Sequence, residues 1–135
     1  MNSIESLKKR FIVNRKEYEK ERLPEYIEKI LKFCKIDEDG IVHFENDKLN
    51  NTEKIKLVLL ARFIANKLNG KIKTTVSLNE IAKSTSLESK RVSARLKEIL
   101  DGNIASRLSK NSYSIYPYKI DEILDKLINK YNPKR

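Results

Sequence analysis

The side chains most often used in catalysis and metal binding are scarce in this 135-residue chain. The single cysteine, Cys34, excludes an intramolecular disulfide and a cysteine zinc site. The single histidine, His43, excludes a multi-histidine metal centre and weakens any histidine-based catalytic triad. The three glycines cannot form a glycine-rich phosphate loop, and neither GxxxxGK[ST] nor GxGxxG occurs. We therefore expect no enzyme, no metal site and no cofactor.

The acidic run at residues 37–39 is a candidate cation site, but it lacks the Asp-x-Asp-x-Asp-Gly pattern and a distal glutamate. A polar turn is the better interpretation. An active site here would have to use carboxylates such as Asp37 or Asp39, because no constellation of base and nucleophile is visible. His43 alternates with apolar neighbours in a β-prone run, and Cys34 lies on an apolar stripe, so both are predicted to be structural.

Charge points to a polyanionic partner. Lys and Arg number 29 against 19 Asp and Glu, which gives a net charge of +10. Residues 71–119 hold ten of the cations and four of the acids, so more than half of the excess lies there. Such an excess favours nucleic acid first and an anionic membrane surface second. No uncharged apolar run approaches the roughly 18–20 residues of a membrane span, and the N-terminus carries charges where a signal peptide needs an apolar core. We expect a cytoplasmic protein without a membrane partner.

The most informative pattern begins at residue 77. Ser77 and Glu80 form a capping box that starts a short helix. Its inward residues are Ile81 and the small Ala82, which allows close helix crossing. Residues 83–86 are predicted to end this helix and turn, with Ser86 at a position that needs a left-handed backbone. Leu87 then fills the angle before a second helix over residues 89–101, whose apolar stripe is Val92, Leu96, Ile99 and Leu100.

A β-hairpin is predicted directly after the second helix. Residues 104–108 and 113–116 are β-prone, and the polar run at 109–112 separates them as a turn. Val76 and its neighbours are predicted to add a third short strand. The aromatic side chains near this hairpin are expected to pack under it rather than to form a base-stacking platform; they are Tyr113, Tyr116 and Tyr118.

The order helix, turn, helix and hairpin over about 77–116 resembles the winged helix-turn-helix of bacterial and archaeal transcription regulators, and with its flanking helices the resemblance extends over about 55–131. It implies a mainly α fold with a small β-hairpin wing, preceded by an N-terminal helical region. The corresponding domains are residues 1–49 and 50–135. The implied function is binding of double-stranded DNA, with a recognition helix at about 89–101 in the major groove and a wing at about 104–116.

Helical geometry divides the cationic residues by expected role, because Val92 marks the buried side of the second helix. The residues expected to contact bases are Ser89, Lys90, Ser93 and Ala94. The residues expected to contact the phosphate backbone are Arg91, Arg95 and Lys97 on the helix and Arg107 and Lys110 on the wing.

The flanking segments are predicted to build the core. Residues 3 to about 35 are expected to form two helices or one kinked helix interrupted at Pro24, followed by a small strand or hairpin at 36–46. Asn50 and Glu53 start a central helix that is apolar on most faces, with N-terminal helices packed on one side, and Asn69-Gly70 stops it. The amphipathic stretch at 120–131 packs either on its own domain or in a dimer. A homodimer through the C-terminal or N-terminal helices is therefore left open.

A competing function is a winged-helix module that binds protein or RNA without sequence-specific recognition of DNA. The salt dependence of binding distinguishes the two, because neutralising several phosphates makes affinity fall steeply with salt.

Overall fold

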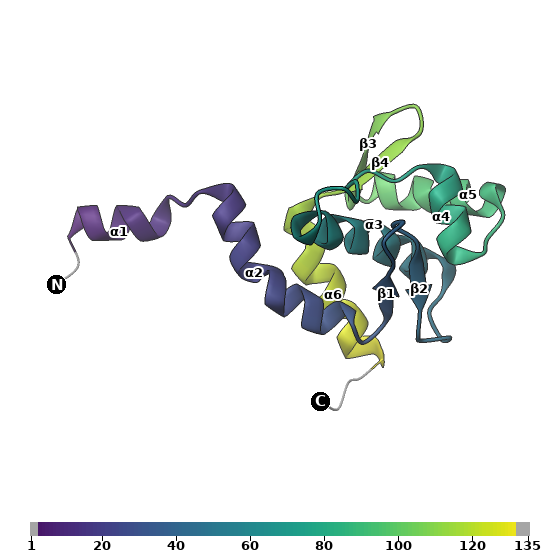
Figure 1. Cartoon of the computed structure of the whole chain (residues 1–135), viewed down its shortest axis with the longest axis horizontal. Helices are drawn as coiled ribbons and strands as arrows, with labels where there is room; N and C mark the ends of the chain where they lie inside the picture. Colours follow the sequence, from purple (N-terminus) through teal and green to yellow (C-terminus); the bar gives the residue numbers. More distant parts are fainter. Residues whose placement is uncertain (1–2, 132–135) are drawn as a thin grey trace.

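The computed structural model describes residues 3–131 and is mainly helical, with two small antiparallel sheets in that part of the chain. The elements in chain order are α1 (Ile4–Phe11), α2 (Arg15–Ile30), β1 (Cys34–Ile36), β2 (Val42–Phe44), α3 (Asn51–Leu68), α4 (Leu78–Thr85), α5 (Ser89–Asp101), β3 (Ala105–Ser109), β4 (Ser112–Ile115), a 3₁₀ turn at Pro117–Lys119 and α6 (Ile120–Tyr131). Figure 1 shows α3 at the centre, the β3–β4 hairpin projecting from the body, and α1 extending away from it.

The central helix α3 is buried on several sides, as its apolar sequence predicts. The Asn50 side chain accepts from the Glu53 backbone N–H, and the Glu53 carboxylate accepts from the Asn50 N–H, so the predicted capping box is present. Helices α2, α4 and α5 all contact α3. The core is one cluster that runs from Leu23 to Leu127 across the predicted boundary at residue 50. Both halves of the chain therefore contribute to the same apolar interior.

One buried arginine ties two connections to α3. The Arg62 side chain is almost fully buried and donates to the backbone oxygens of Gly40, Lys73 and Thr75 at 3.1, 2.7 and 2.8 Å. It also forms an ion pair with Glu80 at 3.4 Å. Gly40 has a φ of 84°, in the region that favours glycine, and it closes the turn between β1 and β2. The predicted hairpin is thus present and is anchored to the central helix.

The N-terminal region differs from its prediction. Pro24 lies inside α2, and the helical break falls at residues 12–14 instead. Asn14 sets this break, because its side chain accepts from the Glu17 backbone N–H at 3.2 Å and starts α2 there. Cys34 is buried as expected, but in strand β1 rather than on a helix. Only α2 covers the core, since no residue of α1 is buried.

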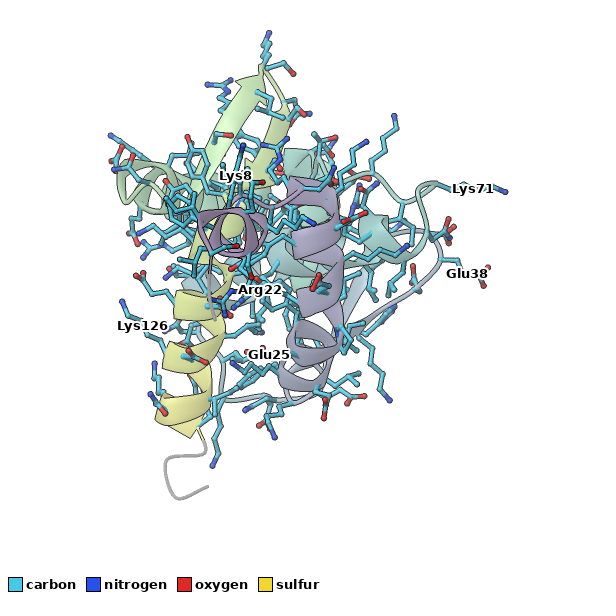
Figure 2. The ribbon with its side chains drawn as sticks, turned by 90° about the vertical axis from the view of Figure 1, so that its left-hand side faces the viewer. Lys8, Arg22, Glu25, Glu38, Lys71 and Lys126 are labelled. Atoms are coloured by element: carbon cyan, nitrogen blue, oxygen red, sulfur yellow. The ribbon has the colours of Figure 1, made fainter. Side chains whose placement is uncertain are left out.

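The C-terminal helix α6 packs within its own chain. Its residues Ile120, Ile123, Leu124 and Leu127 are buried, and α6 lies beside α2 (Figures 1 and 2). Two ion pairs join the helices, Arg22 with Asp121 and Lys29 with Asp125. The apolar stripe of α6 therefore packs within its own chain, which is the first of the two packings predicted for it. No helix of residues 3–131 combines the length and hydropathy needed to cross a bilayer.

Candidate nucleic-acid interface

Helices α4 and α5 pack against each other and both contact α3. Ser77 and Glu80 form the predicted capping box at the start of α4. The helix continues to Thr85 rather than ending near Lys83, because the Thr85 hydroxyl donates to the Ile81 carbonyl at 2.8 Å and is buried. Ser86 takes the left-handed backbone that the motif requires, with a φ of 61°. The turn is thus tight enough to bring α5 back across α4.

The buried stripe of α5 holds this helix from behind. Val92, Leu96 and Ile99 are each at most 2% exposed, and Leu100 packs against the same cluster. The opposite face is exposed and begins in the first turn. It carries the four residues predicted to contact bases together with two predicted phosphate contacts: Ser89, Lys90, Arg91, Ser93, Ala94 and Lys97. A rigid helix with a bare, cationic outer face is the arrangement that reading a DNA groove needs.

A groove of about 720 Å³ lies along one flank of α5. Lys90, Arg91, Ala94 and Arg95 form the α5 wall, and the start of α3 at residues 50–52 forms the opposite wall. Glu88 also lines the groove, so three cations stand there against one acid. Free backbone N–H groups at a helix start carry partial positive charge, which adds to that of the side chains. The groove is therefore suited to an anionic backbone.

The β3–β4 hairpin lies beyond the other flank of α5. Ala105 pairs with Ile115, and Arg107 pairs with Tyr113, with an irregularity between Arg107 and Ser109. Val76 forms an antiparallel bridge with Tyr113, which is the predicted third strand reduced to one bridge. Of the three tyrosines predicted to pack under the hairpin, Tyr113 is buried as predicted, whereas Tyr118 lies in the 3₁₀ turn, is exposed and stacks on Tyr116.

A second groove, of about 710 Å³, runs between α5 and the hairpin. Ser93 and Lys97 line it from α5, and Arg107 and Lys110 line it from the hairpin. The fold thus brings together predicted contact residues that lie up to 17 positions apart in the chain. Both flanks of the exposed α5 face are consequently concave and carry cations.

The five residues predicted to contact phosphates are not equally available. Arg95 is half-buried and forms an ion pair with Glu98 at 3.0 Å. The Arg107 guanidinium donates to the Lys110 carbonyl at 2.6 Å from Nη2, so it closes the hairpin turn from within. Arg91, Lys97 and Lys110 are exposed and their side chains form no ion pair with another described side chain. These three are hence the best placed of the five.

Sequence reasoning missed several residues of these grooves. Asn51 and Thr52 line the first groove with Lys90, whereas the sequence pattern indicates a role only for Asn50 and Glu53, as helix caps. Asn111 lines the second groove and its side chain accepts from the Leu78 backbone N–H at 2.8 Å. Their placement depends on contacts between distant segments, so no local pattern could have indicated it.

The residues weighed for other chemistry lie apart from α5. His43 Nε2 is 2.8 Å from Asp37 Oδ2, and this hydrogen bond, with one from the Ile41 backbone N–H, lowers the pKa of Asp37. Burial raises the pKa of the Cys34 thiol to about 12. His43 lies in β2 and Cys34 lies in β1, so both residues belong to the first hairpin. Within residues 3–131 no group of three or more His, Cys, Asp or Glu side chains is placed to hold a metal ion.

Comparisons with protein-family models, curated proteins and solved structures found no significant match to this chain. The winged-helix identity and the DNA-binding role therefore stay predictions, and their support is the geometry of α5 and its two grooves.

Proposed function

We propose that residues of about 55–131 form a winged helix-turn-helix domain that binds double-stranded DNA, with α5 in the major groove and the β3–β4 hairpin as the wing. The observation that carries the proposal is the exposed cationic face of α5, which the core supports from behind and a groove flanks on each side. The order of α3, α4, α5 and the hairpin also matches the order of elements in the winged helix-turn-helix that the sequence resembles.

The dimensions of B-DNA suit this arrangement. The major groove admits one α-helix, and the phosphate strands that border it then lie along the two sides of that helix. Lys90 and Ser93 can donate to base edges from the centre of the face, and the Ala94 methyl can contact thymine. Arg91 and Lys97 point cations toward the flanking strands, where most protein–DNA hydrogen bonds form. The proposal includes a role as a transcription regulator in the cytoplasm, without enzymatic activity.

The test is a pair of substitutions on the exposed face. Lys90→Ala combined with Arg91→Ala should weaken binding to duplex DNA by about 30-fold or more, because each of the two lost contacts is worth roughly 1–3 kcal/mol. The melting temperature should hardly change, because both side chains are exposed. Fluorescence anisotropy with labelled genomic fragments measures the first quantity, and circular dichroism measures the second.

A matched control removes the same charge elsewhere. Lys16→Ala combined with Lys20→Ala also deletes two exposed cations, but from α2. If the control loses as much affinity as the α5 variant, binding reflects net charge alone. If neither variant binds DNA less well than the parent protein, or the parent protein does not bind, the winged-helix protein- or RNA-interaction module becomes the better interpretation.

A further inference from the structure

A small pocket of about 250 Å³ lies between α3, α6 and the residue that precedes β3, and we call it the lysine pocket. Lys56 lines it from α3, and Lys126 and Lys130 line it from α6. Lys126 projects from the side of α6 opposite α2 (Figure 2). The residues that line the lysine pocket do not line either of the two grooves beside α5. The proposed contact with DNA therefore does not account for this pocket.

Lys56 differs from the other two lysines because it has no counter-ion. Lys130 pairs with Glu53 at 2.8 Å, and Lys126 lies 3.8 Å from Glu122. Among the described residues no carboxylate forms an ion pair with Lys56, although its side chain is half-buried. Partial burial and the nearby charge of Lys126 lower the pKa of Lys56. A half-buried ammonium without a partner is unfavourable, so the pocket favours an anion that would supply one.

The charge of the lining indicates the charge of the ligand. Three lysines against two glutamates leave the lysine pocket with a net charge of +1. A monoanion would neutralise this excess. A phosphate monoester carries about −1.5 to −2 at pH 7 and would leave negative charge beside the two glutamates. The charge balance therefore favours a carboxylate over a phosphate group.

The rest of the lining is apolar and favours a ligand with a short alkyl tail. Ile104, Ile123 and Leu127 complete the wall, and the last two are buried. The volume is smaller than the roughly 300–1,000 Å³ of pockets that hold drug-sized ligands. A ligand that fits must consequently be small, with one anionic end and one apolar end.

We propose that the lysine pocket binds a small organic monocarboxylate, with the carboxylate on Lys56 and the alkyl tail against Ile123 and Leu127. Lys126 adds positive charge at the rim, where its side chain is exposed. Binding of this ligand does not depend on the proposed contact with DNA, so either can fail without the other.

Butyrate is the probe, and butyramide is its neutral counterpart of nearly the same shape. Titration of isotopically labelled protein, followed by NMR, should show saturable shifts at the residues that line the pocket. Butyramide should bind on the order of tenfold more weakly or worse, because it lacks the charge that Lys56 would pair with. A bound carboxylate also favours the charged form of Lys56, so the pKa of Lys56 should rise toward its ordinary value of 10.5. The lysine side-chain signals measure this rise.

Lys56→Gln tests the anchor of the ligand, and Lys54→Gln is its matched control. Lys54 is also a half-buried lysine of α3, but it lies outside the pocket and over the Phe44 ring. Lys56→Gln should weaken butyrate binding on the order of tenfold or more, and Lys54→Gln should leave it unchanged. Circular dichroism checks that both variants fold. Lys126→Gln, at an exposed position, should cause a smaller loss and provides a second test.

Four results would overturn the proposal. Butyrate could leave the signals of the pocket unchanged. Butyramide could bind as tightly as butyrate, which would show an apolar pocket without recognition of an anion. Lys56→Gln could bind butyrate as tightly as the parent protein. Inorganic phosphate could bind more tightly than butyrate, which would assign the pocket to phosphate groups instead.

Discussion

The Glu53 side chain joins the start of α3 to the end of α6 through three partners. Its carboxylate accepts from the Asn50 backbone N–H, pairs with Lys130 Nζ at 2.8 Å and accepts from the Tyr131 hydroxyl. Burial alone would raise the pKa of Glu53, but these three hydrogen bonds outweigh burial and hold the pKa below its ordinary value of 4.5. The ionised carboxylate therefore stabilises the contact between the start of α3 and the end of α6.

The pH dependence of stability follows from that lowered pKa. A carboxyl group whose pKa is lower in the folded state stabilises the fold above its unfolded pKa and loses this contribution as pH falls through the folded pKa. Glu53→Gln should cost about 1–3 kcal/mol at pH 7, and the difference from the parent protein should shrink as pH falls below the ordinary pKa of 4.5 and through the lower pKa of the folded state. Urea denaturation at pH 7 and at low pH measures both quantities.

An exposed glutamate provides the comparison for this prediction. Glu25 pairs with Lys29 on the surface of α2, and its side chain is 51% exposed. Glu25→Gln should change the free energy of unfolding little at either pH, since exposed ion pairs contribute roughly 0–1 kcal/mol. A Glu53→Gln cost that stayed constant from neutral to acid pH would mean that the charge of Glu53 does not matter to the fold.

Helix α5 depends on its buried stripe for its orientation. Leu96 is 2% exposed and lies between α5 and the core. Leu96→Ala should lower the free energy of unfolding by about 2–5 kcal/mol, because it removes buried atoms and leaves a cavity. Leu108→Ala, on the exposed face of the hairpin, should change it by less than about 0.5 kcal/mol. Urea denaturation of both variants decides, and a small effect at Leu96 would show that α5 is not supported from behind.

Elements with strong local signals were predictable from the sequence. The capping residues Asn50 and Ser77 started α3 and α4 where expected, and α5 spans residues 89–101 as predicted. Pro24 misled the prediction. It lacks the backbone N–H that would donate to the Lys20 carbonyl, but both residues are exposed, so α2 tolerates the missing hydrogen bond. The overlooked signal was Asn14 followed by Glu17.

Whether an amphipathic helix is covered depends on distant segments, so the exposure of α1 and the burial of α6 could not be read from periodicity.

The candidate site was predictable only in part, for the same reason. Helical spacing identified which residues of α5 face outward, since Val92 and Leu96 mark the buried side. It could not show that Arg95 pairs with Glu98 or that Arg107 closes its own turn, because rotamers and turn geometry decide those contacts. The places of Asn51 and Asn111 in the groove walls could also be known only from the three-dimensional fold.

For the whole molecule, the net charge of +10 makes the salt dependence of binding a direct test of the proposed partner. Each neutralised phosphate of a duplex contributes about −0.9 to the slope of log affinity against log salt. With the five predicted phosphate contacts the slope should approach −4 to −5. Because Arg95 and Arg107 already have partners, values nearer −3 would implicate the other three residues. Anisotropy titrations over a range of KCl concentrations give this slope, and a flat response would rule out recognition through phosphates.

The shared anchorage at Arg62 has a mechanical consequence. One guanidinium bonds the turn at Gly40 and the connection that leads into α4. A Cβ atom at residue 40 would come within 2.8 Å of Arg62 Nη1, so this turn has no room for a larger residue. A side chain at residue 40 would therefore displace the Arg62 guanidinium and disturb its hydrogen bonds to the first hairpin and to the entry of α4 at the same time.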